Sequence, residues 1–163
     1  RRGVHLTREY LMQRLDALAK GQEGQKIQAA RLFTGLLAEQ EAFRQGQAQY
    51  KYTEVEQSLL IDAVRRSLMD ENWRLRVNTL DAIYSVTIPI DYTLIETLSS
   101  NLNHDRWPVR FMTLTLLSRL QKGSFGAVLD WTAQYDPYPL NRRLAVALGG
   151  KEPVQPQREI AQP

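Results

Sequence analysis

A short motif recurs three times in the second half of this chain, beginning at Asp70, His104 and Asp136, so that successive copies are offset by 34 and 32 residues. The first two copies align tryptophan with tryptophan, an aliphatic residue and arginine with the same pair, and threonine-leucine with threonine-leucine. The third copy keeps the initial aspartate, the arginine and the small-then-apolar steps. A period of this length, if made of two helices, indicates stacked helix pairs that bury their apolar surfaces against one another.

Apolar residues recur at spacings of three and four, and period-two alternation is never sustained, which predicts helices and no strands. Thr53 and Glu56 have the spacing of a capping box, and Pro108 stands in a first helical turn, where its missing N–H costs nothing. Val55, in the helix that begins at Thr53, and Trp131, inside the seventh expected helix, are predicted to be buried. We expect helices that begin near Thr7, Gln22, Thr53, Asp70, Asp91, Asp105, Ser124 and Asp136, the last ending at Gly149-Gly150. Thr7 and Asp91 are expected to cap their helices, the second helix to extend toward Ala42 and Phe43, and Pro89 to stop the fourth.

The domain boundaries follow from these helices. We expect a flexible N-terminus at 1–6, one helical-repeat domain at 7–150, and a disordered tail at 151–163 that is rich in proline, glutamine and charge. Within the domain, an irregular or capping helix pair at 7–45 is expected to precede three repeats at 53–88, 91–122 and 124–149.

The repeated motif resembles the HEAT and HEAT-like (PBS-lyase-type) repeat family, in which an aspartate stands at the turn within a helix pair and Val-Arg opens the second helix. Here the pattern reads Asp70 with Leu75-Arg76, Asp105 with Val109-Arg110, and Asp136 with Asn141-Arg142. The second copy departs by placing His104 at the usual aspartate position, and the third by replacing the aliphatic residue with Asn141. The resemblance covers Thr53 to Leu148. It implies an all-α fold, an α-α superhelix in the form of a short solenoid of HEAT-like helix pairs.

Three arginines, Arg76, Arg110 and Arg142, stand at equivalent positions in the copies. They are candidates for a basic ladder that binds phosphate groups or an acidic partner. In the family, however, such an arginine pairs with the turn aspartate of a neighbouring repeat, and each copy contains an acid to receive it. We favour this structural pairing, because stacked repeats must satisfy polar groups at every interface.

Trp73 and Trp107 stand at equivalent positions just before the second helices. An aromatic pair one repeat apart is suited to stacking nucleobases or to forming a hot spot for a partner, although packing between repeats is the favoured role. His104 stands where a capping aspartate is expected, which predicts a turn or cap role rather than a metal-ligand or base role. The candidate binding residues are therefore Trp73, Trp107, Arg76, Arg110 and Arg142.

No catalytic constellation is present. The sequence contains no glycine-rich phosphate loop, no Gly-x-Ser-x-Gly elbow and no His-Glu-x-x-His motif. The absence of cysteine excludes disulfides and cysteine-based zinc sites, and two histidines make a histidine-rich metal centre improbable. We therefore predict no enzymatic activity, no cofactor and no metal site.

The leading functional hypothesis is a protein–protein interaction scaffold, whose concave surface, lined by the second helices, holds a peptide or a partner domain. The alternative is a nucleic-acid-interacting repeat protein, because a family of DNA glycosylases uses HEAT-like repeats and tryptophan and arginine are suitable residue types. A net charge of only +3, with acids in every repeat, favours the first hypothesis. A third possibility, a bilin-lyase-type enzyme subunit, rests on fold analogy alone.

No apolar run approaches the roughly 20 residues that are needed to span a bilayer, so we expect no membrane insertion within the chain. The chain begins with Arg1-Arg2, which is compatible with the flank of a removed membrane anchor or signal segment, and also with a simple excision boundary. We expect a cytoplasmic protein, with the soluble domain of a membrane-anchored protein as the alternative.

Overall fold

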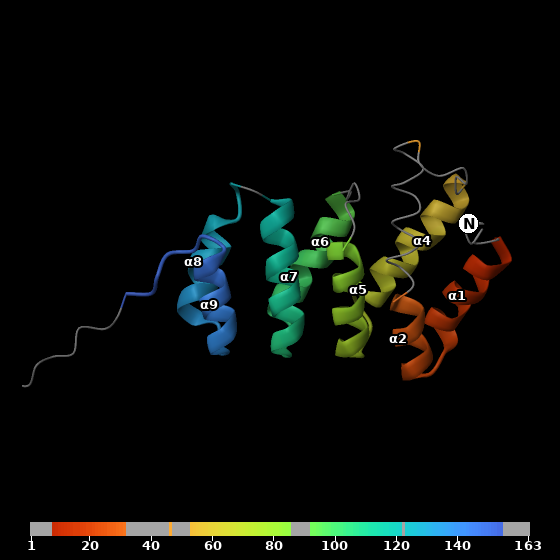
Figure 1. Cartoon of the computed structure of the whole chain (residues 1–163), viewed down its shortest axis with the longest axis horizontal. Helices are drawn as coiled ribbons and strands as arrows, with labels where there is room; N and C mark the ends of the chain where they lie inside the picture. The colour runs from red at the N-terminus through yellow and green to blue at the C-terminus, as the bar shows by residue number, and fades with distance from the viewer. Residues whose placement is uncertain (1–7, 32–45, 47–52, 86–91, 122, 155–163) are drawn as a thin grey trace, which may run out of the picture. The chain divides into compact units, whose positions relative to one another are not determined.

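The computed structural model describes residues 8–31, 46, 53–85, 92–121 and 123–154, which form helices joined by turns and contain no strand (Figure 1). The predicted all-α class is therefore confirmed for the described residues. The chain divides into two compact units, Arg1–Leu116 and Leu117–Pro163. None of the described helices is long and apolar enough to cross a membrane.

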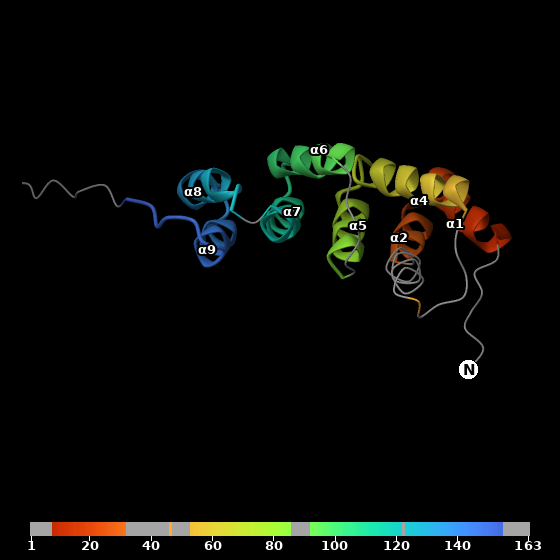
Figure 2. The ribbon, with the colours of Figure 1, turned by 90° about the horizontal axis from the view of Figure 1, so that it is seen from above.

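The first unit has its helices in two layers (Figure 2). Helices α1, α4 and α6 lie in one layer, and α2, α5 and the first part of α7 lie in the other. Helix α1 packs against α2 and α4, and α5 packs against α2 and α4. The helices are α1 (Arg8–Lys20), α2 (Glu23–Arg31), α4 (Glu54–Ser67), α5 (Trp73–Ser85), α6 (Tyr92–Ser100) and α7 (Trp107–Leu120), with a short 3-10 helix, η1 (Asn101–Asn103), after α6.

Helix α4 begins with the predicted capping box. The backbone N–H of Glu56 donates to Thr53 Oγ1 at 3.2 Å, and the backbone N–H of Thr53 donates to Glu56 Oε2 at 3.0 Å. The prediction that Val55 is buried was wrong, because its side chain is 62% exposed. Val55 lies on the helix face of Asp62 and Arg66, which is turned away from the stripe that the fold buries. That stripe consists of Glu56, Leu60, Ala63, Val64 and Ser67.

Apolar side chains from both layers fill the core of the first unit, including most of those expected from the spacing of three and four. The N-terminal helix pair packs into this core, and an ion pair adds a further link: Lys26 Nζ of α2 lies 3.1 Å from Asp70 Oδ2 in the turn before α5. The buried set includes Leu15 and Leu18 of α1, Leu75, Leu80 and Ile83 of α5, Leu94 and Leu98 of α6, and Val109, Leu114 and Leu116 of α7.

Some expectations fall outside the described residues. These are the flexible N-terminus at 1–6, the helix caps at Thr7 and Asp91, the extension of the second helix beyond Arg31, the stop at Pro89, and most of the disordered tail.

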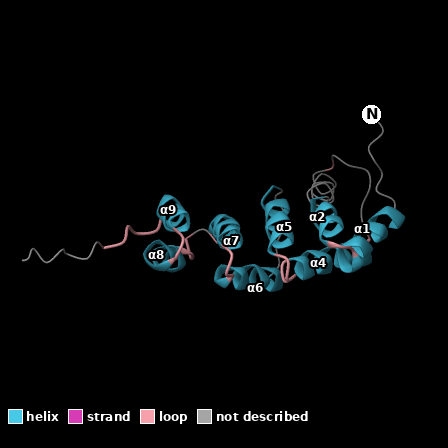
Figure 3. Cartoon of the chain, turned by 90° about the horizontal axis from the view of Figure 1, so that it is seen from below, coloured by secondary structure: helices cyan, strands magenta, loops and turns pink. Residues whose placement is uncertain are grey.

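The second unit contains the end of α7 and the pair α8 (Gly126–Tyr135) and α9 (Pro139–Ala147), which pack against each other (Figure 3). The prediction that Trp131 belongs to the core was wrong, because its side chain is 58% exposed and its ring lies 5.5 Å from that of Tyr135. Trp131 is two residues from both Leu129 and Ala133, so its side chain leaves the helix about half a turn away from that buried face. The buried stripe runs along α8 and includes the residue on either side of it. It consists of Phe125, Leu129, Thr132, Ala133 and Asp136, with the same spacing as the stripe of α4.

Two glycines end α9, as predicted, and each is needed for its own reason. The N–H of Gly150 donates to the Ala145 carbonyl and the N–H of Gly149 to the Val146 carbonyl, which is the Schellman pattern. Gly149 adopts a φ of 114°, which favours glycine. At Gly150, a Cβ would stand 2.9 Å from the carbonyl oxygens of both Ala145 and Leu129, so only a residue without a side chain fits between α8 and α9.

Candidate functional site

The turns that precede α5, α7 and α9 share one hydrogen bond. In each, the side chain of the first residue accepts from the backbone N–H two residues later, as in an Asx turn. The bonds are Asn72 N to Asp70 Oδ1 (2.8 Å), Arg106 N to His104 Nδ1 (3.0 Å) and Tyr138 N to Asp136 Oδ1 (2.9 Å). The sequence alignment of the three copies is therefore also a structural one, and the predicted turn role of His104 is confirmed.

A second bond recurs in the same turns and involves the three candidate arginines. Arg76 donates to the Asp70 carbonyl at 2.6 Å, Arg110 to the His104 carbonyl at 2.8 Å, and Arg142 to the Asp136 carbonyl at 2.7 Å. Each guanidinium thus binds a main-chain carbonyl of its own turn, a contact that the expected pairing with a neighbouring carboxylate did not include. These carbonyls follow the end of a helix and have no partner within it, so a cation six residues later satisfies them.

Arg76 also links successive helix pairs. Its Nη1 donates to Asn101 Oδ1 at 2.9 Å, and Asn101 Nδ2 donates to the carbonyls of Leu68 and Thr97, each at 3.1 Å. Asn101 is completely buried. A buried amide, rather than an aspartate carboxylate, therefore joins the turn before α5 to the end of α6.

His104 lies among positive charges. Burial lowers the pKa of its imidazole below the ordinary value of 6.5, and the charge of Arg76 lowers it further, with smaller contributions from Arg110 and Arg106; the carboxylate of Asp105 opposes them. The neutral ring is the form that the turn requires, because Nδ1 must be free to accept from the N–H of Arg106.

This arrangement predicts a pH dependence of stability. Because the folded pKa lies below the unfolded value, the unfolded chain binds the proton more readily once the pH falls through 6.5. The free energy of unfolding of the wild type is therefore expected to fall relative to that of His104→Asn between about pH 7.5 and pH 5. Asparagine can accept the same turn bond without titrating. Urea unfolding of both proteins across this range measures the difference, and parallel pH profiles would contradict the assignment.

Trp73, the first residue of α5, is partly exposed and receives two guanidinium groups. The Cζ atom of Arg74 lies 4.7 Å from the ring centroid, and that of Arg106, from the next turn along the chain, lies 5.7 Å from it. Both distances are within the range of cation–π attraction. Trp73 thus has a contact between repeats, as expected, and also presents an indole with two cations at the surface.

Trp107 packs against an aromatic neighbour. Its ring packs edge-on against Phe111 of the same helix, with centroids 6.1 Å apart and planes at 87°. The corresponding residue in the third copy is Pro139, at the start of α9. Of the five predicted site residues, Arg76, Arg110 and Arg142 donate to turn carbonyls, whereas the two cations at Trp73 are Arg74 and Arg106, which were not among the five.

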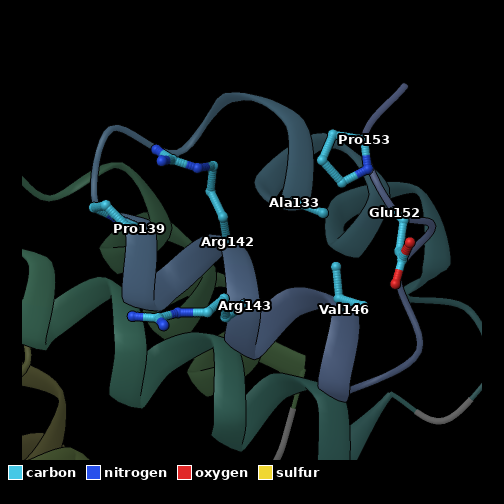
Figure 4. A pocket seen from close by; sticks show the side chains of 7 residues that line it. All are labelled: Ala133, Pro139, Arg142, Arg143, Val146, Glu152 and Pro153. Atoms are coloured by element: carbon cyan, nitrogen blue, oxygen red, sulfur yellow. The ribbon is translucent and has the colours of Figure 1, made fainter. Parts of the chain in front are cut away.

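A second surface feature is an open groove of about 560 Å³ in the second unit. In Figure 4, Arg142 and Arg143 extend on the left, and Glu152 stands on the right. Arg142 already donates to the Asp136 carbonyl, so its guanidinium is only partly available to a ligand. The lining consists of Ala133, Pro139, Arg142, Arg143, Val146, Glu152 and Pro153.

Among the described residues, no group of three or more histidine, cysteine or carboxylate side chains is placed to hold a metal ion. No protein-family model matches the chain, and no curated protein or solved structure matches it either. The sequence had indicated Trp73 but not Arg74 and Arg106. The only available signal was that both are basic residues close to an aligned tryptophan in adjacent copies.

Proposed function

We propose that this chain is a non-catalytic HEAT-like repeat module whose helix pairs stack as a short superhelical solenoid and bind another protein. The observation that carries the proposal is the turn that recurs before α5, α7 and α9 with the same side-chain cap and the same arginine-to-carbonyl bond. The same turn, formed by partly different residues in each copy, would hold successive helix pairs in a constant register.

The binding face in this proposal is formed by the second helices of the pairs. In the first unit these are α2, α5 and the beginning of α7, which share one layer (Figure 2). Trp73 stands at the N-terminal end of α5 on this layer, partly exposed. Tryptophan and arginine are the residue types that most often dominate the binding energy of protein interfaces, and Trp73 has both chemistries in one place.

The nucleic-acid alternative has less support. It requires three arginines to bind successive phosphates, but each of them donates to a turn carbonyl: Arg76, Arg110 and Arg142. Binding along a nucleic-acid backbone relies on neutralising several phosphates with available cations.

Affinity capture with the purified chain, after nuclease treatment, tests the proposal. Proteins that bind the proposed face should be recovered by the wild type and depleted at least tenfold by Trp73→Ala, since truncation of a hot-spot tryptophan costs about 2 kcal/mol or more. Trp131→Ala is the matched control, because it removes an exposed indole from the second unit. Equal recovery by the wild type and Trp73→Ala would show that this face is not the binding surface.

A further inference from the structure

We infer that Trp73, Arg74 and Arg106 form a recognition site for the carboxylate side chains of an acidic segment in a partner protein. The inference rests on the proposed protein-binding function and names the chemistry of its partner. Its basis is the convergence of two guanidinium groups, from two successive copies of the motif, on one partly exposed indole ring.

Arginine bound to an aromatic ring keeps much of its hydrogen-bonding capacity. The guanidinium is planar, so the ring attracts it while its N–H groups can still form paired bonds to a carboxylate. The indole ring therefore positions two guanidinium groups whose N–H groups can donate to carboxylate oxygens. The same ring supplies apolar contact to the aliphatic part of a glutamate or to a neighbouring residue of the partner.

Neither guanidinium is committed to a strong partner. Within the described part of the chain, the Arg106 guanidinium has no carboxylate or carbonyl bond, and its contact is with the Trp73 ring. Arg74 Nη1 lies 3.6 Å from Glu23 Oε1, with the two side chains 59% and 56% exposed. An exposed pair at this distance contributes little, so a partner carboxylate can replace Glu23 at small cost.

The backbones of both arginines are held by the turns. The N–H of Arg74 donates to Asn72 Oδ1 at 2.9 Å, and the N–H of Arg106 donates to His104 Nδ1 at 3.0 Å. Positions that are ordered before binding lose less conformational entropy when a ligand arrives. The caps that build the turns thus also position the cations.

The local acids favour a short acidic peptide over a nucleic acid. Glu71 and Asp105 are exposed and directly precede Asn72 and Arg106, and Glu23 is close to Arg74. A phosphate backbone carries charge continuously along its length, so it would pass these acids as well as the cations. The separate carboxylates of a peptide can reach the two guanidinium groups without passing close to these acids.

The test is a titration of the ¹⁵N-labelled full chain with a blocked pentaglutamate peptide, followed through the indole N–H signals. The chain has three tryptophans, so three indole signals report on Trp73, Trp107 and Trp131. The Trp73 signal is expected to shift to saturation and the Trp131 signal to stay in place. Arg106→Gln and Arg74→Gln should each weaken binding about fivefold or more. Arg143→Gln, an exposed cation of the second unit, is the matched control and should leave the Trp73 titration unchanged.

Three results would overturn the inference: no shift of Trp73 with the peptide, equal binding by Arg106→Gln and the wild type, or tighter binding of an oligodeoxythymidylate than of the peptide at the same salt concentration. The last result would assign the site to nucleic acid. Failure here can be told apart from failure of the proposed function. If the peptide has no effect but Trp73→Ala still depletes captured proteins, the binding face stands and only its acidic specificity is wrong.

Discussion

Replacing Asn101 with alanine is expected to lower the free energy of unfolding of the first unit by about 3 kcal/mol. The substitution removes three hydrogen bonds at a completely buried position. It leaves the Leu68 carbonyl, at the end of α4, without its side-chain donor, and it takes an acceptor away from the partly buried Arg76 guanidinium. An unsatisfied buried carbonyl costs about 1–3 kcal/mol, and the loss of a bond to a charged group adds to that cost.

The matched control is Asn103→Ala in the same 3-10 helix, where the side chain is exposed. A substitution at such a position is expected to change stability by less than about 0.5 kcal/mol. Urea unfolding followed by far-ultraviolet circular dichroism measures both variants. Similar unfolding midpoints for Asn101→Ala and Asn103→Ala would show that the buried amide does not hold the helix pairs together.

Features that depend on local chemistry could be predicted from the sequence. The capping box of α4 requires only residues three positions apart, and its two hydrogen bonds are present. The end of α9 at two glycines follows from the φ that a helix terminus demands. The turn role of His104 followed from its alignment with an aspartate. In each case the cause lies within a few residues of the effect.

Features that depend on packing could not be predicted in the same way. Val55 and Trp131 are apolar and lie within helices, yet both are exposed. Whether such a residue is buried depends on which face of its helix the neighbouring element covers. The spacing of apolar residues alone does not decide between two adjacent faces. Conversely, the polar Asn101 is buried, because its position three residues before the turn residue is a core position in every copy: Ser67 and Ala133 are buried there too.

The candidate site shows the same limit. The period draws attention to residues that recur, such as Arg76, Arg110 and Arg142, and these residues hold the turns together. Arg74 and Arg106 occupy different positions within their copies, so no alignment pairs them. They meet at Trp73 only because consecutive turns lie side by side. In a repeat protein, recurrence thus identifies the framework, and the differences between copies identify the surface available to a ligand.

The second unit depends on the glycines that end α9. Replacing Gly150 with alanine is expected to destabilise that unit by about 2 kcal/mol, because the new Cβ would stand 2.9 Å from two backbone oxygens, on α9 and α8, and rigid backbone must move to admit it. Gly126→Ala is the control: a Cβ there meets nothing within 4 Å, so it should be neutral or slightly stabilising. Hydrogen exchange of the α8 and α9 amides should accelerate about thirtyfold in Gly150→Ala alone. Unchanged protection would mean that α8 and α9 can move apart enough to admit the Cβ without loss of stability, and would contradict the prediction.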